Sequence, residues 1–152
     1  MGILDCIFKR NNKSSEDYND IESLNFMDID SVLEIVIQLN KDIWKDTSKW
    51  KNNNLKMEQY LTRLLLSSPN NTRALTSLGA TLSDSGKHKE ALAELLKAEK
   101  LKSKDANLYL NIGIAKMNIE SERPNAKEYF DKASRLESDK LTFEAYFDPH
   151  GH

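Results

Sequence analysis

Apolar residues recur at helical spacing along the N-terminal half of the chain, and polar stretches separate the segments that carry them. Ser31 and Glu34 have the spacing of a capping box, so we expect a helix to begin at Ser31. The asparagine run at 52–54 is predicted to interrupt regular structure. A second helix should end before Pro69, because proline disfavours the helical conformation of the preceding residue. The two apolar faces, expected in the core, are Val32, Leu33, Val36, Leu39, Ile43 and Trp44, and then Met57, Tyr60, Leu61, Leu64 and Leu65.

Four shorter helices are predicted in the following seventy residues. Asn70 or Asn71 can cap the first of them, with Gly86 behind its C-terminal end, and Asp105 can cap the third. Proline is favoured in the first turn of a helix, so we expect the fourth to begin at Pro124. Nothing alternates between apolar and polar with a period of two over a useful length. The sequence therefore predicts an all-α fold without a sheet.

One pattern of small and large apolar residues occurs twice. A shift of 34 residues places Leu75, Leu78 and Gly79 on Tyr109, Ile112 and Gly113. A shift of 35 residues places Ala91, Leu95 and Ala98 on Ala126, Phe130 and Ala133. The one-residue difference falls in the turn between two helices, where an insertion costs little. The doubled pattern resembles the tetratricopeptide repeat, a 34-residue unit of two antiparallel helices.

The resemblance implies a stack of helix-turn-helix units, an α-solenoid. Gly79 and Gly113 stand where the first helix of each unit runs close against the second, which leaves no room for a side chain. Lys116 departs from the family pattern, which has a large aromatic residue at this position, while the first copy has Leu82. The expected fold therefore depends most directly on these two helix crossings.

The predicted organisation is one helical domain between two terminal segments. Clear similarity to the repeat family covers residues 71–104 and 105–138, and residues 28–68 are interpreted as a degenerate third repeat or an N-terminal cap. The sequence DKLTFEAYF is expected to cover the apolar face of the last repeat, as the ends of such arrays require. The predicted segments are an amphipathic stretch at 1–10, a polar linker at 11–27, the helical domain at 28–147 and a tail at 148–152.

The resemblance also implies a function, because the first helices of tetratricopeptide arrays line a concave groove that usually holds a peptide segment of another protein. By this analogy the chain is a non-catalytic adaptor or scaffold without cofactor or metal. Family members that grip a C-terminal carboxylate have lysine and asparagine where Thr76 and Ala80 stand, so only Asn111 matches that clamp. The positions expected to bind the partner are Arg73, Thr76, Ala80, Asn107, Leu110, Asn111, Ile114 and Met117.

Composition narrows the range of partners. The chain of 152 residues carries 22 lysines and arginines against 24 aspartates and glutamates, so it has no basic excess that would indicate nucleic-acid binding. A single cysteine, Cys6, argues against a disulfide framework and is compatible with the reducing cytoplasm, where we expect the protein. No apolar run approaches the roughly 20 residues that a membrane-spanning helix needs.

A metal-dependent or thiol enzyme is the alternative from another functional class. Asp148, His150 and His152 alternate near the C-terminus, and carboxylate and imidazole groups suit zinc or nickel. Cys6 is the candidate nucleophile of the thiol version, although no histidine stands near it in the sequence.

The first ten residues suggest a second kind of contact. A secretory signal would place basic residues before its apolar ones, the reverse of the order here, so export is not expected. Ile3, Leu4, Ile7 and Phe8 fall on one side of a short helix, which needs a surface to persist. That surface is this protein's own array, a partner, or a membrane, in which case the chain is a peripheral membrane adaptor. A short array with open ends can also form a homo-oligomer by stacking on a copy of itself.

Overall fold

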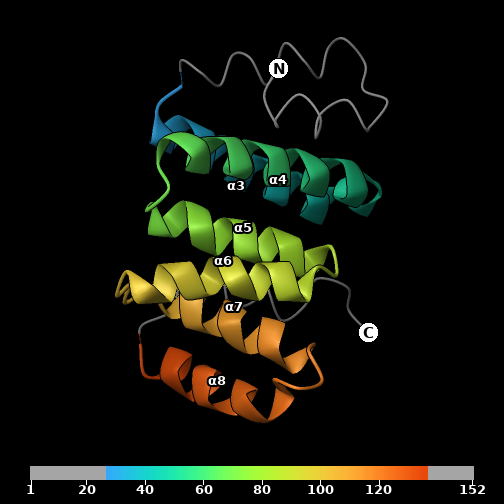
Figure 1. The fold of residues 1–152 in the computed structure, drawn as a ribbon. Coiled ribbons are helices and arrows are strands. Elements are labelled where there is room, and N and C mark those ends of the chain that lie inside the picture. Colours follow the sequence, from blue (N-terminus) through green and yellow to red (C-terminus); the bar gives the residue numbers. More distant parts are fainter. Residues whose placement is uncertain (1–26, 137–152) are drawn as a thin grey trace, which may run out of the picture.

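The computed structural model describes residues 27–136, which form three antiparallel helical hairpins stacked one on another (Figure 1). The helices are α3 (Ile29–Lys45), α4 (Trp50–Ser67), α5 (Thr72–Asp84), α6 (His88–Lys100), α7 (Ala106–Met117) and α8 (Ala126–Ser134). The pairs α5–α6 and α7–α8 make the most extensive contacts. This part of the chain contains α-helices, two short 3-10 turns and no strand. The predicted all-α architecture of helix-turn-helix units is confirmed.

The two glycines lie at the helix crossings, as the repeat pattern predicts. A Cβ atom on Gly79 would stand 2.4 Å from Cγ of Leu95, which belongs to the opposite helix of the same hairpin. In the next hairpin, a Cβ atom on Gly113 of α7 would stand 2.8 Å from Cε1 of Phe130 on α8. Both separations are shorter than real Cβ contacts, so glycine is required for the two helices of each hairpin to approach this closely.

Helix caps explain where several elements begin. The Asn71 side chain accepts a hydrogen bond of 2.9 Å from the backbone N–H of Ala74, and Asp105 accepts one of 2.9 Å from the N–H of Asn107. These caps satisfy backbone donors that the first turn of a helix leaves unpaired. Gly86 follows α5 with a φ of 76°, a conformation that glycine adopts without strain. The predicted caps and terminator of these helices are confirmed.

Two predicted helix starts are wrong. Asp28, and not Ser31, caps α3, because its carboxylate accepts a hydrogen bond of 2.9 Å from the Ser31 backbone N–H and another of 2.7 Å from the Ser31 hydroxyl. At the other end of the array, Pro124 lies in a 3-10 turn, Arg123–Asn125, and α8 begins after it at Ala126. In both places the residue on which the prediction rested, Ser31 or Pro124, lies within three residues of the observed start of the helix.

The prediction that the asparagine run breaks regular structure is also wrong, since α4 begins at Trp50 and continues through it. Asn53 is buried and donates a hydrogen bond of 3.0 Å to the carbonyl oxygen of Leu39 in α3. Asn54 is buried and donates to the carbonyl oxygen of Thr81, at 3.1 Å, and to Oγ of Ser85, at 2.7 Å. These contacts with α3 and the end of α5 outweigh the low helical propensity of asparagine.

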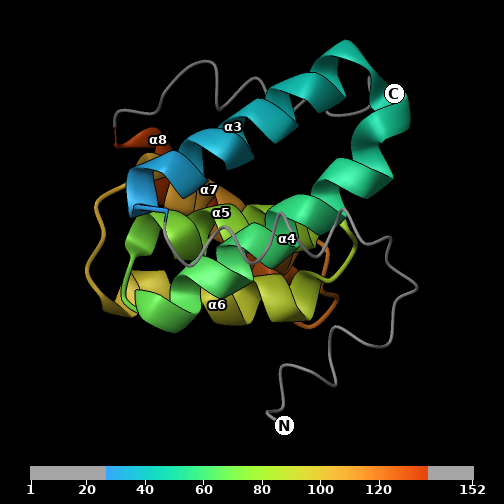
Figure 2. The same cartoon turned by 90° about the horizontal axis from the view of Figure 1, so that it is seen from above.

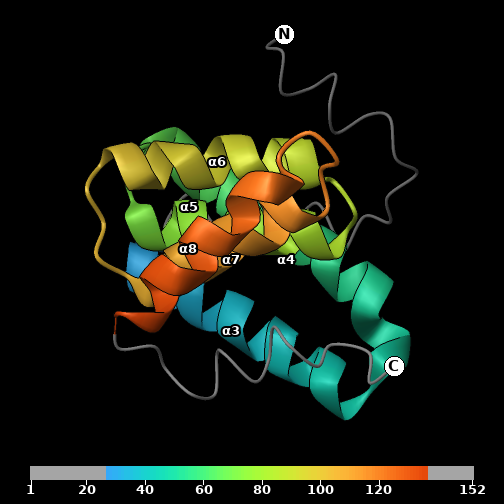
Figure 3. The ribbon, with the colours of Figure 1, turned by 90° about the horizontal axis from the view of Figure 1, so that it is seen from below.

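Trp44 does not lie in the core as predicted. Its side chain is 45% exposed, and Ile37, one heptad earlier on α3, is 46% exposed. Figures 2 and 3, seen from above and below, show the reason: α3 starts beside the other helices and diverges from them toward its turn into α4. The second half of α3 therefore keeps apolar side chains that nothing in the described chain covers fully.

Several predictions concern residues outside the described range of 27–136. They include the amphipathic stretch at 1–10, the covering segment DKLTFEAYF, Cys6, and the alternating Asp148, His150 and His152. The predicted boundaries of the terminal segments likewise stay predictions. None of the helices within 27–136 combines the length and apolar character that crossing a bilayer requires.

Candidate functional site

The first helices of the three hairpins, α3, α5 and α7, carry the residues of the candidate site. Helices α5 and α7 pack against each other, although a whole helix, α6, separates them in sequence. An ion pair of 3.2 Å between Asp30 of α3 and Arg73 of α5 joins the first hairpin to this pair. Arg73 is one of the groove positions expected from the sequence, so this contact places Asp30 at the edge of the same face.

The eight residues predicted to bind a partner differ widely in exposure. Arg73 is exposed and Met117 is 48% exposed, while Asn107 and Ile114 are partly buried. The other four are buried: Thr76, Ala80, Leu110 and Asn111. Leu110 retains only 2% of its surface and belongs to the hydrophobic core, so a partner reaches Met117 and Ile114 directly but not Leu110.

Polar side chains along α5 and α7 bond mainly to their own helices. The Thr76 hydroxyl donates to the Thr72 carbonyl oxygen at 2.8 Å, and the Asn111 amide donates to the Asn107 carbonyl oxygen at 2.8 Å. These bonds leave the side-chain oxygens, Oδ1, of Asn107 and Asn111 buried and without a hydrogen-bond partner in the described chain. Two buried acceptors one turn apart on α7 are thus left unpaired.

Two exposed residues of α3 are not among the predicted binding positions: Ile37 is not singled out by the sequence pattern, and Trp44 is predicted to lie in the core. Ile37 and Trp44 follow Asp30 at intervals of seven residues, which places the three on one side of the helix. Since Asp30 contacts Arg73 at the groove, Ile37 and Trp44 extend that face along α3. The heptad spacing was visible in the sequence, but only the divergence of α3 distinguishes this stripe from the adjacent core face.

The C-terminal end of α5 carries an unusual carboxyl group. Loss of hydration raises the pKa of Asp84 to about 6, although Asp84 is an exposed residue, which limits the effect of this shift. The corresponding residue of the next hairpin, 34 positions later, is the neutral Asn118. Its amide donates a hydrogen bond of 2.9 Å to the Ile114 carbonyl oxygen. At neutral pH this end of the face therefore carries the Asp84 carboxylate on α5 and a neutral amide on α7.

Comparison with known proteins connects this geometry to a family. The family model of the tetratricopeptide repeat matches residues 79–119. The chain carries a tetratricopeptide repeat. The match runs from Gly79 at the first crossing through α6 and α7, and it confirms the resemblance drawn from the residue pattern. No curated protein and no solved structure matches the chain.

The tetratricopeptide repeat indicates a protein–protein interaction module. Its role in this chain depends on which surfaces stay open in the folded array. In the first helices the open apolar side chains are Ile29, Ile37 and Trp44 on α3 and Met117 on α7. Within residues 27–136 no three histidine, cysteine, aspartate or glutamate side chains gather in a way that could hold a metal ion.

Proposed function

We propose that the protein is a small adaptor that binds an extended peptide segment of a partner along α3, α5 and α7. The observation that carries this proposal is the exposure of Ile37, Trp44 and Met117 on the first helices of the outer hairpins. Large apolar side chains left open to water contribute to binding when a partner covers them, by about 1.5–3 kcal/mol for each one fully buried. Tryptophan in particular is enriched among the residues that dominate binding energy.

The polar groups between these anchors favour recognition of a peptide backbone. The unpaired Oδ1 atoms of Asn107 and Asn111 are acceptors, and a peptide supplies one N–H donor per residue. An unpaired buried acceptor costs about 1–3 kcal/mol, so a donor that reaches it after a small side-chain rotation is favoured. Thr76 and Ala80 provide no cation for a terminal carboxylate, so the proposed ligand is an internal segment with apolar side chains.

A display library of random peptides on the full chain tests the proposal. Peptides selected on the native protein should bind the Met117→Asp and Trp44→Ala variants at least about tenfold more weakly, because each change removes an apolar anchor worth about 1.4 kcal/mol or more. Binding is measured by isothermal titration calorimetry. Leu110 is not a suitable position, because it is 2% exposed and a charge there would disrupt the core.

The matched control is Leu55→Asp. Leu55 lies on α4 and is 40% exposed, similar to Trp44, but it belongs to a second helix of a hairpin. This variant should bind the selected peptides as the native chain does. If Trp44→Ala and Met117→Asp keep full affinity while Leu55→Asp loses it, the binding face lies on the second helices and the proposal is wrong.

A further inference from the structure

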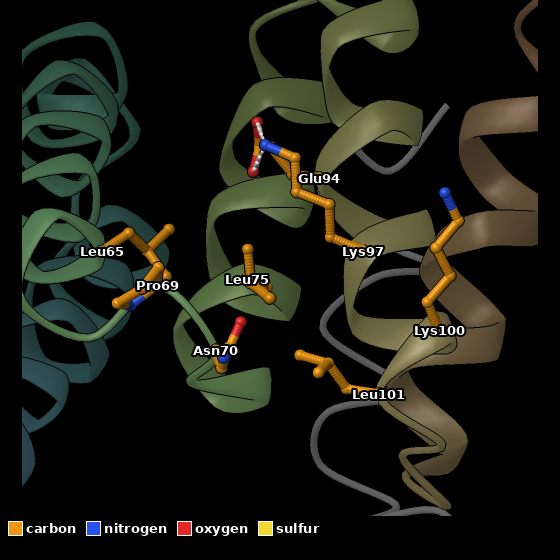
Figure 4. A pocket seen from close by; sticks show the side chains of 8 residues that line it. All are labelled: Leu65, Pro69, Asn70, Leu75, Glu94, Lys97, Lys100 and Leu101. Atoms are coloured by element: carbon orange, nitrogen blue, oxygen red, sulfur yellow. Dashed lines mark hydrogen bonds and ion pairs between the residues drawn. The ribbon is translucent and has the colours of Figure 1, made fainter.

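A second surface lies on the opposite helices of the array, away from the groove residues. A cleft of about 410 Å³ opens between the end of α4, the start of α5 and the end of α6 (Figure 4). Leu65 and Pro69 form one wall, Leu75 lies at the centre, and Leu101 closes the other side. Leu101 is 41% exposed, so the cleft presents apolar surface to solvent.

Lysines surround the apolar part of this cleft. Lys97 and Lys100 line it, and Lys102 and Lys104 follow in the loop after α6. Lys97 is neutralised by Glu94 at 2.8 Å, the dashed contact in Figure 4. The other three form no ion pair with any residue of the described range. A ligand that fits this cleft therefore combines carboxylates with a large apolar side chain.

The chain itself contains such a segment. Residues 137–152 hold four acidic side chains and one lysine, which gives a side-chain charge of −3 with the histidines neutral. The same residues include Leu141, Phe143, Tyr146 and Phe147. The segment thus complements the cleft in both charge and apolar character.

The described chain ends at the same end of the array as the cleft, on the side of α3 (Figures 2 and 3). Lys132 of α8 bonds to Glu99 of α6 at 3.3 Å, and Leu101 is only two residues beyond Glu99. Leu136, the last described residue, is four residues beyond Lys132. Figure 1 shows the C-terminal ends of α6 and α8 at the same side of the array. Seven extended residues span roughly 23 Å, about two helix-to-helix spacings, so residues after 143 reach the cleft easily.

The exposed apolar residues also favour the cleft over the end of the array. The large apolar side chains with substantial exposure in the described chain lie on α3, on α4, at Leu101 and at Met117, and none lies on α8. Helix α8 therefore presents little that a covering segment would bury. We infer that residues 137–152 dock in the cleft of α4, α5 and α6, with an aromatic side chain between Leu65 and Leu101 and carboxylates beside Lys100, Lys102 and Lys104.

Zero-length carbodiimide cross-linking of the full chain tests this site, because it joins a lysine amine to a carboxylate only when the two are in contact. Mass spectrometry should find links from Lys100, Lys102 or Lys104 to Glu144 or Asp148 within single chains. Leu101→Asp should abolish these links and the slowed amide exchange of residues 141–147, while the circular dichroism spectrum stays unchanged. Leu55→Asp, on an equally exposed leucine of α4, should leave both signals intact.

Three results would overturn the inference. Links from Glu144 or Asp148 to Lys41 or Lys45 would place the segment against α3. Links found only in covalent dimers would assign the cleft to a second copy. Fast exchange of residues 141–147 in the native chain, with no links, would show that the segment does not dock. All three are independent of peptide binding by Trp44 and Met117, so the inference and the proposed function can fail separately.

Discussion

The hairpins α5–α6 and α7–α8 use the same backbone crossing with different side chains. In the first, Gly79 faces Leu95, which is completely buried. In the second, Gly113 faces the ring of Phe130, which is only partly buried. Both copies thus have glycine on the first helix, whereas the residue that faces it on the second helix is leucine in one copy and phenylalanine in the other. The glycine of the first copy thus faces a fully buried side chain, and that of the second copy faces a partly buried one.

The largest chemical difference lies one turn beyond the glycines, where Leu82 of the first hairpin corresponds to Lys116 of the second. Lys116 is 8% exposed, and its Nζ lies 2.6 Å from Oε2 of Glu122 and 5.2 Å from the ring centre of Tyr129. The hydrogen bond from Lys116 holds the pKa of Glu122 below its usual value. Glu122 lies in the turn whose length changes the repeat offset from 34 to 35, so the altered turn also supplies the counter-ion.

Substitution of the two glycines by alanine should separate the hairpins most clearly. Gly79→Ala pushes a methyl group into Leu95, which has no free space, and should lower the free energy of unfolding by about 1–3 kcal/mol, the usual cost of overpacking. Gly113→Ala should cost clearly less, because the half-buried ring of Phe130 can move, while the helical propensity gained with alanine, about 1 kcal/mol, is common to both variants. Urea denaturation of both variants measures the difference.

An equal loss in the two variants would show that Phe130 is held as rigidly as Leu95. A matched control is Ser77→Gly on α5, which lowers helical propensity without touching the crossing. Its effect, about 0.5–1 kcal/mol, calibrates how much of each alanine result comes from propensity alone.

The sequence predicted the crossings well because they depend on local spacing. The glycines, the facing Leu95 and Phe130, and the caps at Asn71 and Asp105 all lie within one repeat unit. The asparagine run at 52–54 was predicted wrongly, since its helix depends on hydrogen bonds to residues up to 31 positions away.

The candidate site was less predictable than the fold. Family positions indicate which side of a helix faces the groove, but not how neighbouring helices cover it. Thr76 and Leu110 are therefore buried although they occupy groove positions. Trp44 is exposed because α3 diverges from the array, a feature of packing between helices that periodicity along one helix does not report.

Lys116 and Glu122 should respond unequally to substitution. Lys116→Leu gives the second hairpin the same residue type as Leu82 in the first. The free energy of unfolding should stay within about 1 kcal/mol of the native value or rise, because replacing a buried ion pair by apolar residues is often neutral or stabilising. Glu122→Gln should lower stability, because it leaves the ammonium group of Lys116 buried without its counter-ion. Urea denaturation at two salt concentrations checks both. If Lys116→Leu is the more destabilising change, the pair is required for packing.

The smallest expected difference concerns Asp84, whose counterpart is Asn118. Its pKa is raised from 3.8 to about 6 by loss of hydration, so the folded state holds a proton that the unfolded state releases between these values. Stability from this group is therefore present at low pH and decreases as the pH rises from about 4 to 6. Asp84→Asn removes that dependence. The free energy of unfolding of the native chain minus that of the variant should therefore decrease as the pH rises from about 4 to 6 and stay constant outside this range. Partial solvent access keeps the effect small. A nuclear magnetic resonance titration that places the Asp84 pKa near 4 would show that its carboxyl is fully hydrated, and the expected pH dependence of stability would then be absent.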